Sequence, residues 1–474
     1  MLLTTPAHSQ VLQGVFNIDT RHLFTSSDLT KGWWEEGRID PVMLPSVSGL
    51  RFRTVSIYDD VYRETGTQRR NQVNRFEHAS YLEVPLGARQ GGLGIEFSHL
   101  AANVRSNPSS EEKSYLGWSI QRLSAGIGRH VWQRRLTVGS RVGVTRMAGS
   151  WLPAGSLALI VRPHKAVSLT VRAGRRPDLR ILDWRIEEEQ YHAEIKLWQS
   201  WWAAGLRLDF LPRLLVNVEY KRDRTHALAR WYKGDGFGFD PGVNTEGVKA
   251  VVQIHPAEGT SVEMRWRTLS MDSICEAFHN GDKFGKLTEF LLNETNVELI
   301  GAYRFTNSTQ VALTYGDYRV TSRQQGHMDP WPFSATIFVQ ILRTYYRGSG
   351  EARVNRLAAR YTRDKDARED WTFQVGYVWM TPDFELLQRR TKLIIFFDSD
   401  ELVRSYLNII HAEFLVPEVR KTFALGGMIL TYAFAKAIPT RIRLREAPPP
   451  VEPPEEKVEA RGGSFHLLSL SYVW

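Results

Sequence analysis

Two neighbouring segments, Leu206-Arg207-Leu208-Asp209-Phe210 and Val216-Asn217-Val218-Glu219-Tyr220-Lys221, show the alternating pattern from which the fold can be predicted. Apolar residues occupy every second position, and charged or amide residues lie between them. Successive side chains of a β-strand point to opposite faces, so each segment is predicted to be a strand with one apolar and one polar face. The link Leu211-Pro212-Arg213-Leu214 has proline turn chemistry, so the two strands are predicted to form an antiparallel hairpin.

The same alternation recurs from about residue 47 to the end of the chain, for example in residues 191–197 and 262–267. Tight turns are predicted at residues 162–165, 211–214, 255–258 and 306–309, and longer links at residues 233–247, 271–295 and 321–332. Alternation alone fits both a soluble sandwich and a membrane barrel, because each has one apolar and one polar strand face. Short turns that alternate with longer links favour the barrel. Strands over residues 191–210 and 214–232 exceed the length that a bilayer requires, so we expect them to project beyond it as a collar.

The last strand carries a further signal. The chain ends Phe465-His466-Leu467-Leu468-Ser469-Leu470-Ser471-Tyr472-Val473-Trp474, with Leu468, Leu470 and Tyr472 stepping back in twos from a terminal aromatic residue. This ending resembles the closing strand of bacterial outer-membrane β-barrels of the porin and transporter kind. The resemblance implies that Leu468, Leu470, Tyr472 and Trp474 close the barrel and form the signal read by the barrel-assembly machinery. It extends to the barrel class over residues 47–474 and to no specific family.

Composition narrows the class further. No stretch approaches the roughly 18 apolar residues of a membrane helix. Aromatic residues make up 11% of the chain, with 15 Trp and 17 Tyr, and such rings favour membrane interfaces. Cys275 is the single cysteine, so neither an intrachain disulfide nor a cysteine-based metal site is possible. The net charge of +9 is spread among acidic residues rather than clustered, so no nucleic-acid partner is predicted.

We therefore predict an all-β fold, a single large antiparallel transmembrane β-barrel of about 16–20 strands with short periplasmic turns and longer extracellular loops. Residues 1–46 precede it as a periplasmic tail or a plug segment, and residues 47–474 form the barrel. Residues 446–460 are rich in proline and acidic residues, so they are predicted to be an extended, extracellular loop. The resemblance implies the location, which is the outer membrane of a Gram-negative bacterium.

The polar strand faces supply the candidate site. In a barrel these faces line the lumen, where charges of both signs pair across strands and can filter ions. The predicted lumen-lining residues are Arg172, Lys196, Arg207, Asp209, Glu219, Lys221, Glu263, Arg265, Arg267 and Arg304. His192 and His466 are expected on the face opposite the apolar stripes. An ion-paired inner wall and a weakly anion-selective pore are both compatible with this set.

Enzyme chemistry is not predicted. No catalytic residues and no cofactor can be assigned, because no nucleophile, base and acid are brought together by the sequence. No metal site is predicted either: Asp398-Ser399-Asp400-Glu401 is too short to supply the 6–8 oxygen ligands of calcium and is expected to be an acidic outer turn.

Two functions remain open. The first is a channel or transporter for small solutes, because a barrel of 16 or more strands is wide enough for water. The second is a scaffold subunit in a larger outer-membrane complex for secretion, surface display or nutrient uptake. Strands that are apolar on both faces, at residues 337–342, 393–397 and 407–410, favour it, because both of their sides must be covered. The expected partners are outer-membrane lipid and lipopolysaccharide, the barrel-assembly machinery, and other outer-membrane proteins or lipoproteins.

Overall fold

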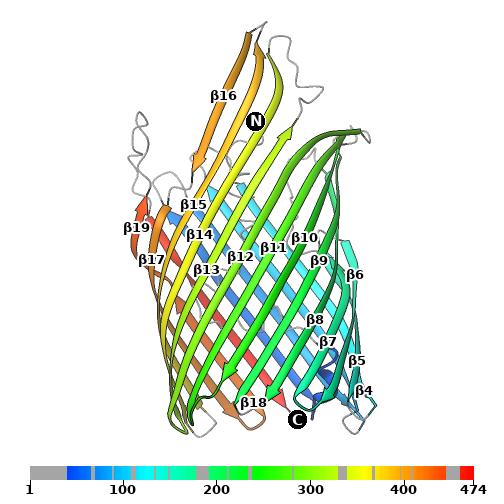
Figure 1. The fold of residues 1–474 in the computed structure, drawn as a ribbon, viewed down its shortest axis with the longest axis vertical. Coiled ribbons are helices and arrows are strands. Elements are labelled where there is room, and N and C mark those ends of the chain that lie inside the picture. Colours follow the sequence, from blue (N-terminus) through cyan, green and yellow to red (C-terminus); the bar gives the residue numbers. More distant parts are fainter. Residues whose placement is uncertain are drawn as a thin grey trace.

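The chain forms one closed antiparallel β-barrel with its strands tilted against the barrel axis (Figure 1). This computed structural model describes residues 40–65, 70–87, 90–107, 114–132, 135–147, 150–177, 192–210, 213–232, 237–279, 282–328, 339–365, 369–394, 397–406, 409–444 and 459–473. Among these residues, no helix is long and apolar enough to cross a membrane.

Apart from a short 3-10 turn, η1 (Leu44–Ser46), the regular elements of the described residues are strands. The strands are β1 (Arg51–Thr65), β2 (Arg70–Leu86), β3 (Gly91–Asn107), β4 (Ser114–Val131), β5 (Leu136–Met147), β6 (Ser150–His164), β7 (Val167–Pro177), β8 (His192–Phe210), β9 (Leu214–Tyr232), β10 (Phe237–Ile254), β11 (Thr260–His279), β12 (Asp282–Thr306), β13 (Thr309–Met328), β14 (Val339–Lys365), β15 (Glu369–Ile394), β16 (Phe397–Tyr406), β17 (Ile409–Leu425), β18 (Met428–Lys436), β19 (Ile438–Leu444) and β20 (Glu459–Val473).

Together these segments form 18 complete strands of the barrel wall, each of which crosses the barrel once and is here called a pass. β15 pairs with β16 near its end and with β17 near its start, so β16 and β17 are two parts of one pass. β17 pairs in the same way with β18 and β19, which form the next pass. The prediction of about 16–20 strands is confirmed.

The barrel closes between the first and last strands. β1 pairs with β20 from Arg51↔Val473 to Thr65↔Glu459, without a gap in the ladder between Arg51 and Asp60. The strand ends joined at residues 165–166, 307–308 and 426–427 lie at the same end of the barrel as the end of β20 (Figure 1). In outer-membrane barrels that end is periplasmic. The tight turns predicted at residues 162–165, 211–214, 255–258 and 306–309 all fall there and are confirmed. The turns at Gly259 and Gly426 place these residues at φ 73° and 61°, where a side chain would be strained.

The longer links were predicted wrongly. Most of residues 233–247, 271–295 and 321–332 belong to β10, β11, β12 and β13, and Asp398 to Glu401 lie in β16 rather than in a turn. The physical reason is that these strands leave the apolar zone, so both of their faces become polar and resemble loops in the sequence. The extra length forms the collar, in which β14, β15 and β16 rise above β17 and β19 on one side (Figure 1).

Several predictions concern residues that lie outside the described set. These are residues 1–39 of the tail or plug, most of the extracellular loop at residues 446–460, residues 337–338 with the side chains of residues 339–342, and the side chains of residues 393–397 and 407–409. The division of the chain at residue 46 also stays a prediction. Residues 40–46 are described, and they lie on the inner side of the wall, as shown below.

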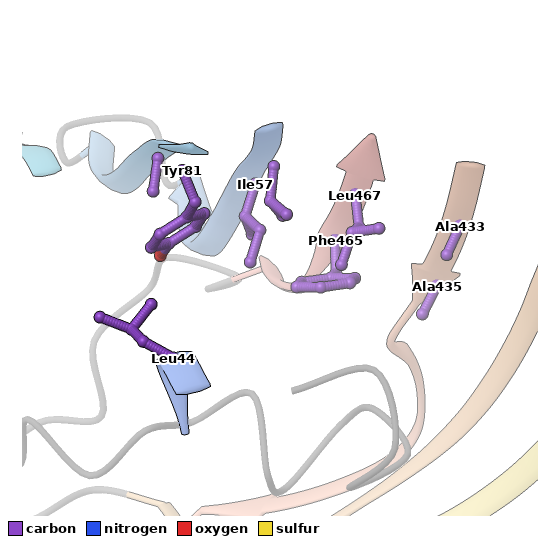
Figure 2. Close-up of a cluster of buried hydrophobic side chains, with 9 residues drawn as sticks. Leu44, Ile57, Tyr81, Ala433, Ala435, Phe465 and Leu467 are labelled. Carbon is purple, nitrogen blue, oxygen red and sulfur yellow. The ribbon is translucent and has the colours of Figure 1, made fainter. Parts of the chain in front are cut away.

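Apolar clusters are present on the inner face as well. One brings together residues of η1, β1, β2, β18 and β20 at the barrel seam; Figure 2 shows Leu44 facing Tyr81 and Ile57, with Phe465 and Leu467 beside them. A second cluster crosses β12, β13, β14, β15 and β17 and reaches the link between β18 and β19; it contains Phe290, Leu292, Tyr318, Val320, Val354, Val378, Val416 and Ala437. Parts of the inner wall are therefore packed rather than lined by polar groups.

Candidate functional site

The outer face carries an apolar belt. Large apolar side chains of alternate positions are exposed around the wall, including Leu123, Val142, Leu157, Leu313 and Val375. Aromatic residues lie near the periplasmic edge of this belt: Trp371 stacks on Phe373 with ring centroids 5.6 Å apart, and Lys421 Nζ lies 4.3 Å from the Trp371 centroid. An apolar outer belt edged by aromatic rings is the surface that a transmembrane barrel presents to lipid.

The belt ends where outward positions become charged. On β13, Leu313 and Tyr315 are followed on the same face by Asp317 and Arg319. Asp317 accepts two hydrogen bonds of 3.0 Å from Arg353 on β14. Ionised side chains are costly in hydrocarbon, so this level marks the extracellular boundary of the membrane.

The predicted lumen-lining residues all lie in strands β7–β12. Nine of them share the face opposite the exposed apolar residues, for example Arg207 and Asp209 opposite Leu206 and Phe210. The side chain of Lys196 lies outside the described set. The structure therefore places the charged faces of these strands inward, while their role in a lumen stays a prediction.

Most of these residues form ion pairs with inward neighbours. Arg172 Nη1 lies 2.8 Å from Glu219 Oε2, and Arg207 Nη2 lies 2.8 Å from Asp209 Oδ2. Arg265 binds Glu263 and lies 2.9 Å from Glu298. Two further pairs are longer, Lys221 with Asp223 at 3.3 Å and Arg267 with Glu294 at 3.7 Å. Arg304, at the periplasmic end of β12, is exposed on the same face as the buried Ile300 and Ala302.

Within these pairs the cation is usually the more exposed partner. The side chains of Lys221 and Asp223 are 38% and 9% exposed, and those of Arg267 and Glu294 are 38% and 11% exposed. Arg51 and Arg53, on the inner face of β1, are also exposed. The reverse holds for Glu219 with Arg172 and for Glu263 with Arg265. Among the described inner residues, water therefore meets positive charge chiefly at Arg51, Arg53, Arg207, Lys221 and Arg267.

A second set of inward charges lies on strands with weaker alternation and was not predicted from the sequence. Arg141 binds Glu96 at 2.7 Å and donates to Ser124 Oγ, and Glu96 is only 1% exposed. On the opposite wall, Gln374 donates to the buried Glu418 at 3.2 Å, and Arg420 pairs with Asp370 at 3.2 Å. The signal for Glu96 was present, because Ile95 and Phe97 flank it as outward apolar residues.

The terminal strand lies where the resemblance implied. Leu468, Leu470 and Tyr472 face outward on β20 and are paired with Ser56, Thr54 and Phe52 of β1. Trp474 lies outside the described residues, and the role of all four in assembly stays a prediction. The inward placement of His466 was wrong: it shares the parity of Leu468 and lies against outward rings, with Tyr432 OH 3.1 Å from Nδ1. His192 begins β8, but its side chain is not among those described.

Among the described residues, no group of three or more His, Cys, Asp or Glu side chains is arranged to hold a metal ion.

No protein-family model and no curated protein sequence matches the chain. Solved structures similar to it include a bacterial polysaccharide outer-membrane secretin (7% identity, TM-score 0.38, covering 90% of this chain and 99% of that one). A second is OpdQ of Pseudomonas aeruginosa (12% identity, TM-score 0.35, covering 90% of this chain and 99% of that one). A third is the toluene transporter TodX of P. putida (9% identity, TM-score 0.35, covering 92% of this chain and 93% of that one). The closed 18-strand wall, its apolar belt and its short periplasmic turns identify the chain as a β-barrel of the bacterial outer-membrane class.

Proposed function

We propose that this barrel is a channel or transporter that moves small solutes, with a preference for anions, across the outer membrane. The observation that carries the proposal is the exposure of Arg207, Lys221 and Arg267 on the inner wall, each paired with a carboxylate that is less exposed. Barrels with 16–18 strands are wide enough to hold an aqueous channel. Exposed positive charge in such a channel raises the local concentration of anions.

The test is the reversal potential of the purified protein in a planar bilayer under a potassium chloride gradient. We expect a reversal potential of the sign given by chloride preference. The substitution Arg207→Glu changes an exposed inner charge and should shift the potential by several millivolts toward cation preference. Arg353→Glu, on the outer face above the belt, is the matched control and should leave the potential unchanged. A cation-selective wild type, or equal shifts in both variants, would contradict the proposal.

A scaffold role in a larger envelope complex is the second candidate. The collar supports it, because its outer face contains a hollow of about 640 Å³ lined by residues that include Asn293, Arg323, Glu351 and Asp383. A polar hollow above the belt offers a surface to lipopolysaccharide, a lipoprotein or another outer-membrane protein. Copurification after gentle extraction tests this role: a stoichiometric protein partner favours the scaffold, and a barrel that conducts alone favours the channel. For both the channel role and the scaffold role, we propose no enzyme activity and no cofactor.

A further inference from the structure

A row of small residues crosses the inner wall near its periplasmic end. Gly92 of β3 pairs with Gly128 of β4, Gly128 with Gly139 of β5, and Gly139 with Ala158 of β6. The row continues from Ala158 to Arg172 of β7. Four neighbouring strands thus contribute small inward residues at one level, and the fifth contributes a cation.

Residues 40–46, here called the strap, lie along this row. A Cβ atom built on Gly92 would clash with the backbone of Leu44, and one on Gly128 would clash with the carbonyl oxygen of Pro41. A Cβ on Gly139 would lie 2.7 Å from the carbonyl carbon of Pro41. Val42 packs against Ala158 and Ile160 in a buried cluster. The absence of side chains on the wall is what lets the backbone of the strap approach it so closely.

The strap is a compact structure rather than an extended tail. Asp40 accepts hydrogen bonds from Val42 N through its side chain and from Met43 N through its carbonyl oxygen. η1 follows, with a hydrogen bond from Val47 N to Leu44 O, and two prolines restrict the backbone. Val42 and Leu44 are buried, whereas Met43 is 53% exposed and points away from the wall.

Both ends of the strap are fixed to the barrel. At one end Leu44 belongs to the seam cluster with Val55, Ile57 and Tyr81 (Figure 2). At the other end Asp40 Oδ2 lies 2.6 Å from Arg172 Nη2, and the same guanidinium binds Glu219 of β9 at 2.8 Å. The strap therefore spans the inner wall from β1 to β7 and is tied to one of the residues predicted to line the lumen.

We infer that the strap is a built-in constriction of the periplasmic mouth, seated on the glycine row and latched by the ion pair of Asp40 with Arg172. This inference rests on the proposed channel function, because a constriction matters only if solutes pass. A segment attached to the inner wall occupies lumen cross-section that a bare wall would leave to water. The latch is more accessible than the seat: the side chains of Asp40 and Arg172 are 30% and 27% exposed, so anions in the lumen can compete for the guanidinium.

The experiment measures strap position and conductance in the same proteins. Cysteines replace Val42 and Ala158, which belong to one buried cluster, in a chain where Cys275 is replaced by Ser. The disulfide should form readily and leave single-channel conductance at the wild-type value. Gly128→Ala should then lower the disulfide yield at least threefold and, without the cysteines, raise the conductance about twofold.

Gly316→Ala is the matched control, because Gly316 also faces inward but has its nearest neighbour, Arg356 Cβ, at 3.8 Å. Gly316→Ala should change neither the disulfide yield nor the single-channel conductance. Heat-dependent migration in gels should show that all variants are folded barrels. Retention of the disulfide in Gly128→Ala would overturn the glycine seat. Loss of the disulfide with equal, non-zero conductances would overturn the constriction alone. Loss of the disulfide with no conductance in any variant would overturn the channel function and the constriction with it.

Discussion

The wall formed by β1–β6, here called the short wall, and the wall formed by β12–β15, here called the tall wall, both consist of alternating strands but differ in strand length. β5 and β6 have 12 and 15 residues, whereas β14 and β15 have 27 and 26. A transmembrane strand needs only about 9–11 residues. Because the periplasmic ends are aligned by short turns, the surplus on the tall wall must extend outside the cell, where it forms the collar. The short wall instead receives the strap on its inner face.

Both walls carry inward ion pairs, but the tall wall also carries one on its outer face. On the short wall the Glu96 and Arg141 pair is turned inward and is largely buried. On the tall wall the Arg353 and Asp317 pair is turned outward above the belt and is 45% and 32% exposed. Inward charge on the short wall therefore contributes to the packed structure, and outward charge on the tall wall faces the polar surroundings of the membrane. Three predictions test this comparison.

The largest expected effect concerns the membrane boundary on the tall wall. Arg319→Cys and Leu313→Cys place a thiol at two outward positions of β13, one on either side of the boundary, in a chain with Cys275→Ser. A membrane-impermeant maleimide added to intact cells should label the cysteine at 319 almost fully and the one at 313 hardly at all, because the second lies in lipid. Equal labelling would show that the belt does not end between these positions.

The second prediction concerns the buried charge pair of the short wall. Glu96→Gln leaves Arg141 without its carboxylate in a buried site, which should lower the free energy of unfolding by about 3–5 kcal/mol. Asp209→Asn removes the partner of Arg207 in a more exposed pair, and the cost should be about 0–1 kcal/mol. Urea unfolding in lipid vesicles, followed by tryptophan fluorescence, measures both. Similar losses would mean that burial does not set the strength of these pairs.

How far the sequence predicted these features follows from the periodicity of each region. Residues 206–210 and 216–221 alternate strictly, so both the hairpin and the inward direction of Arg207 and Glu219 were predictable. The collar was not, because above the lipid neither strand face has to be apolar and the alternation disappears. Asp40 was also missed: its partner Arg172 is 132 residues away, and only the closed barrel brings them together.

The glycine row could not be predicted from the sequence either. Gly92, Gly128 and Gly139 lie in three separate strands, and nothing in one sequence indicates that they are neighbours in one register row. Glycine is unfavourable within a strand because it has no side chain to pack. The structure explains the three neighbouring glycines, because the strap occupies the space that their side chains would fill.

The smallest expected effect tests how tightly the short wall holds the strap. Leu44→Ala removes the side chain that joins η1 to the seam cluster, and we expect a loss of about 2 kcal/mol in the free energy of unfolding, at the low end for buried leucine. The low value follows from the position of Leu44 at the edge of a wall that retains its own strand hydrogen bonds. Met43→Ala is the matched control, since Met43 is 53% exposed and should cost almost nothing. Equal effects of the two substitutions in urea unfolding would show that the strap does not pack on the seam, and the two walls would then differ only in height.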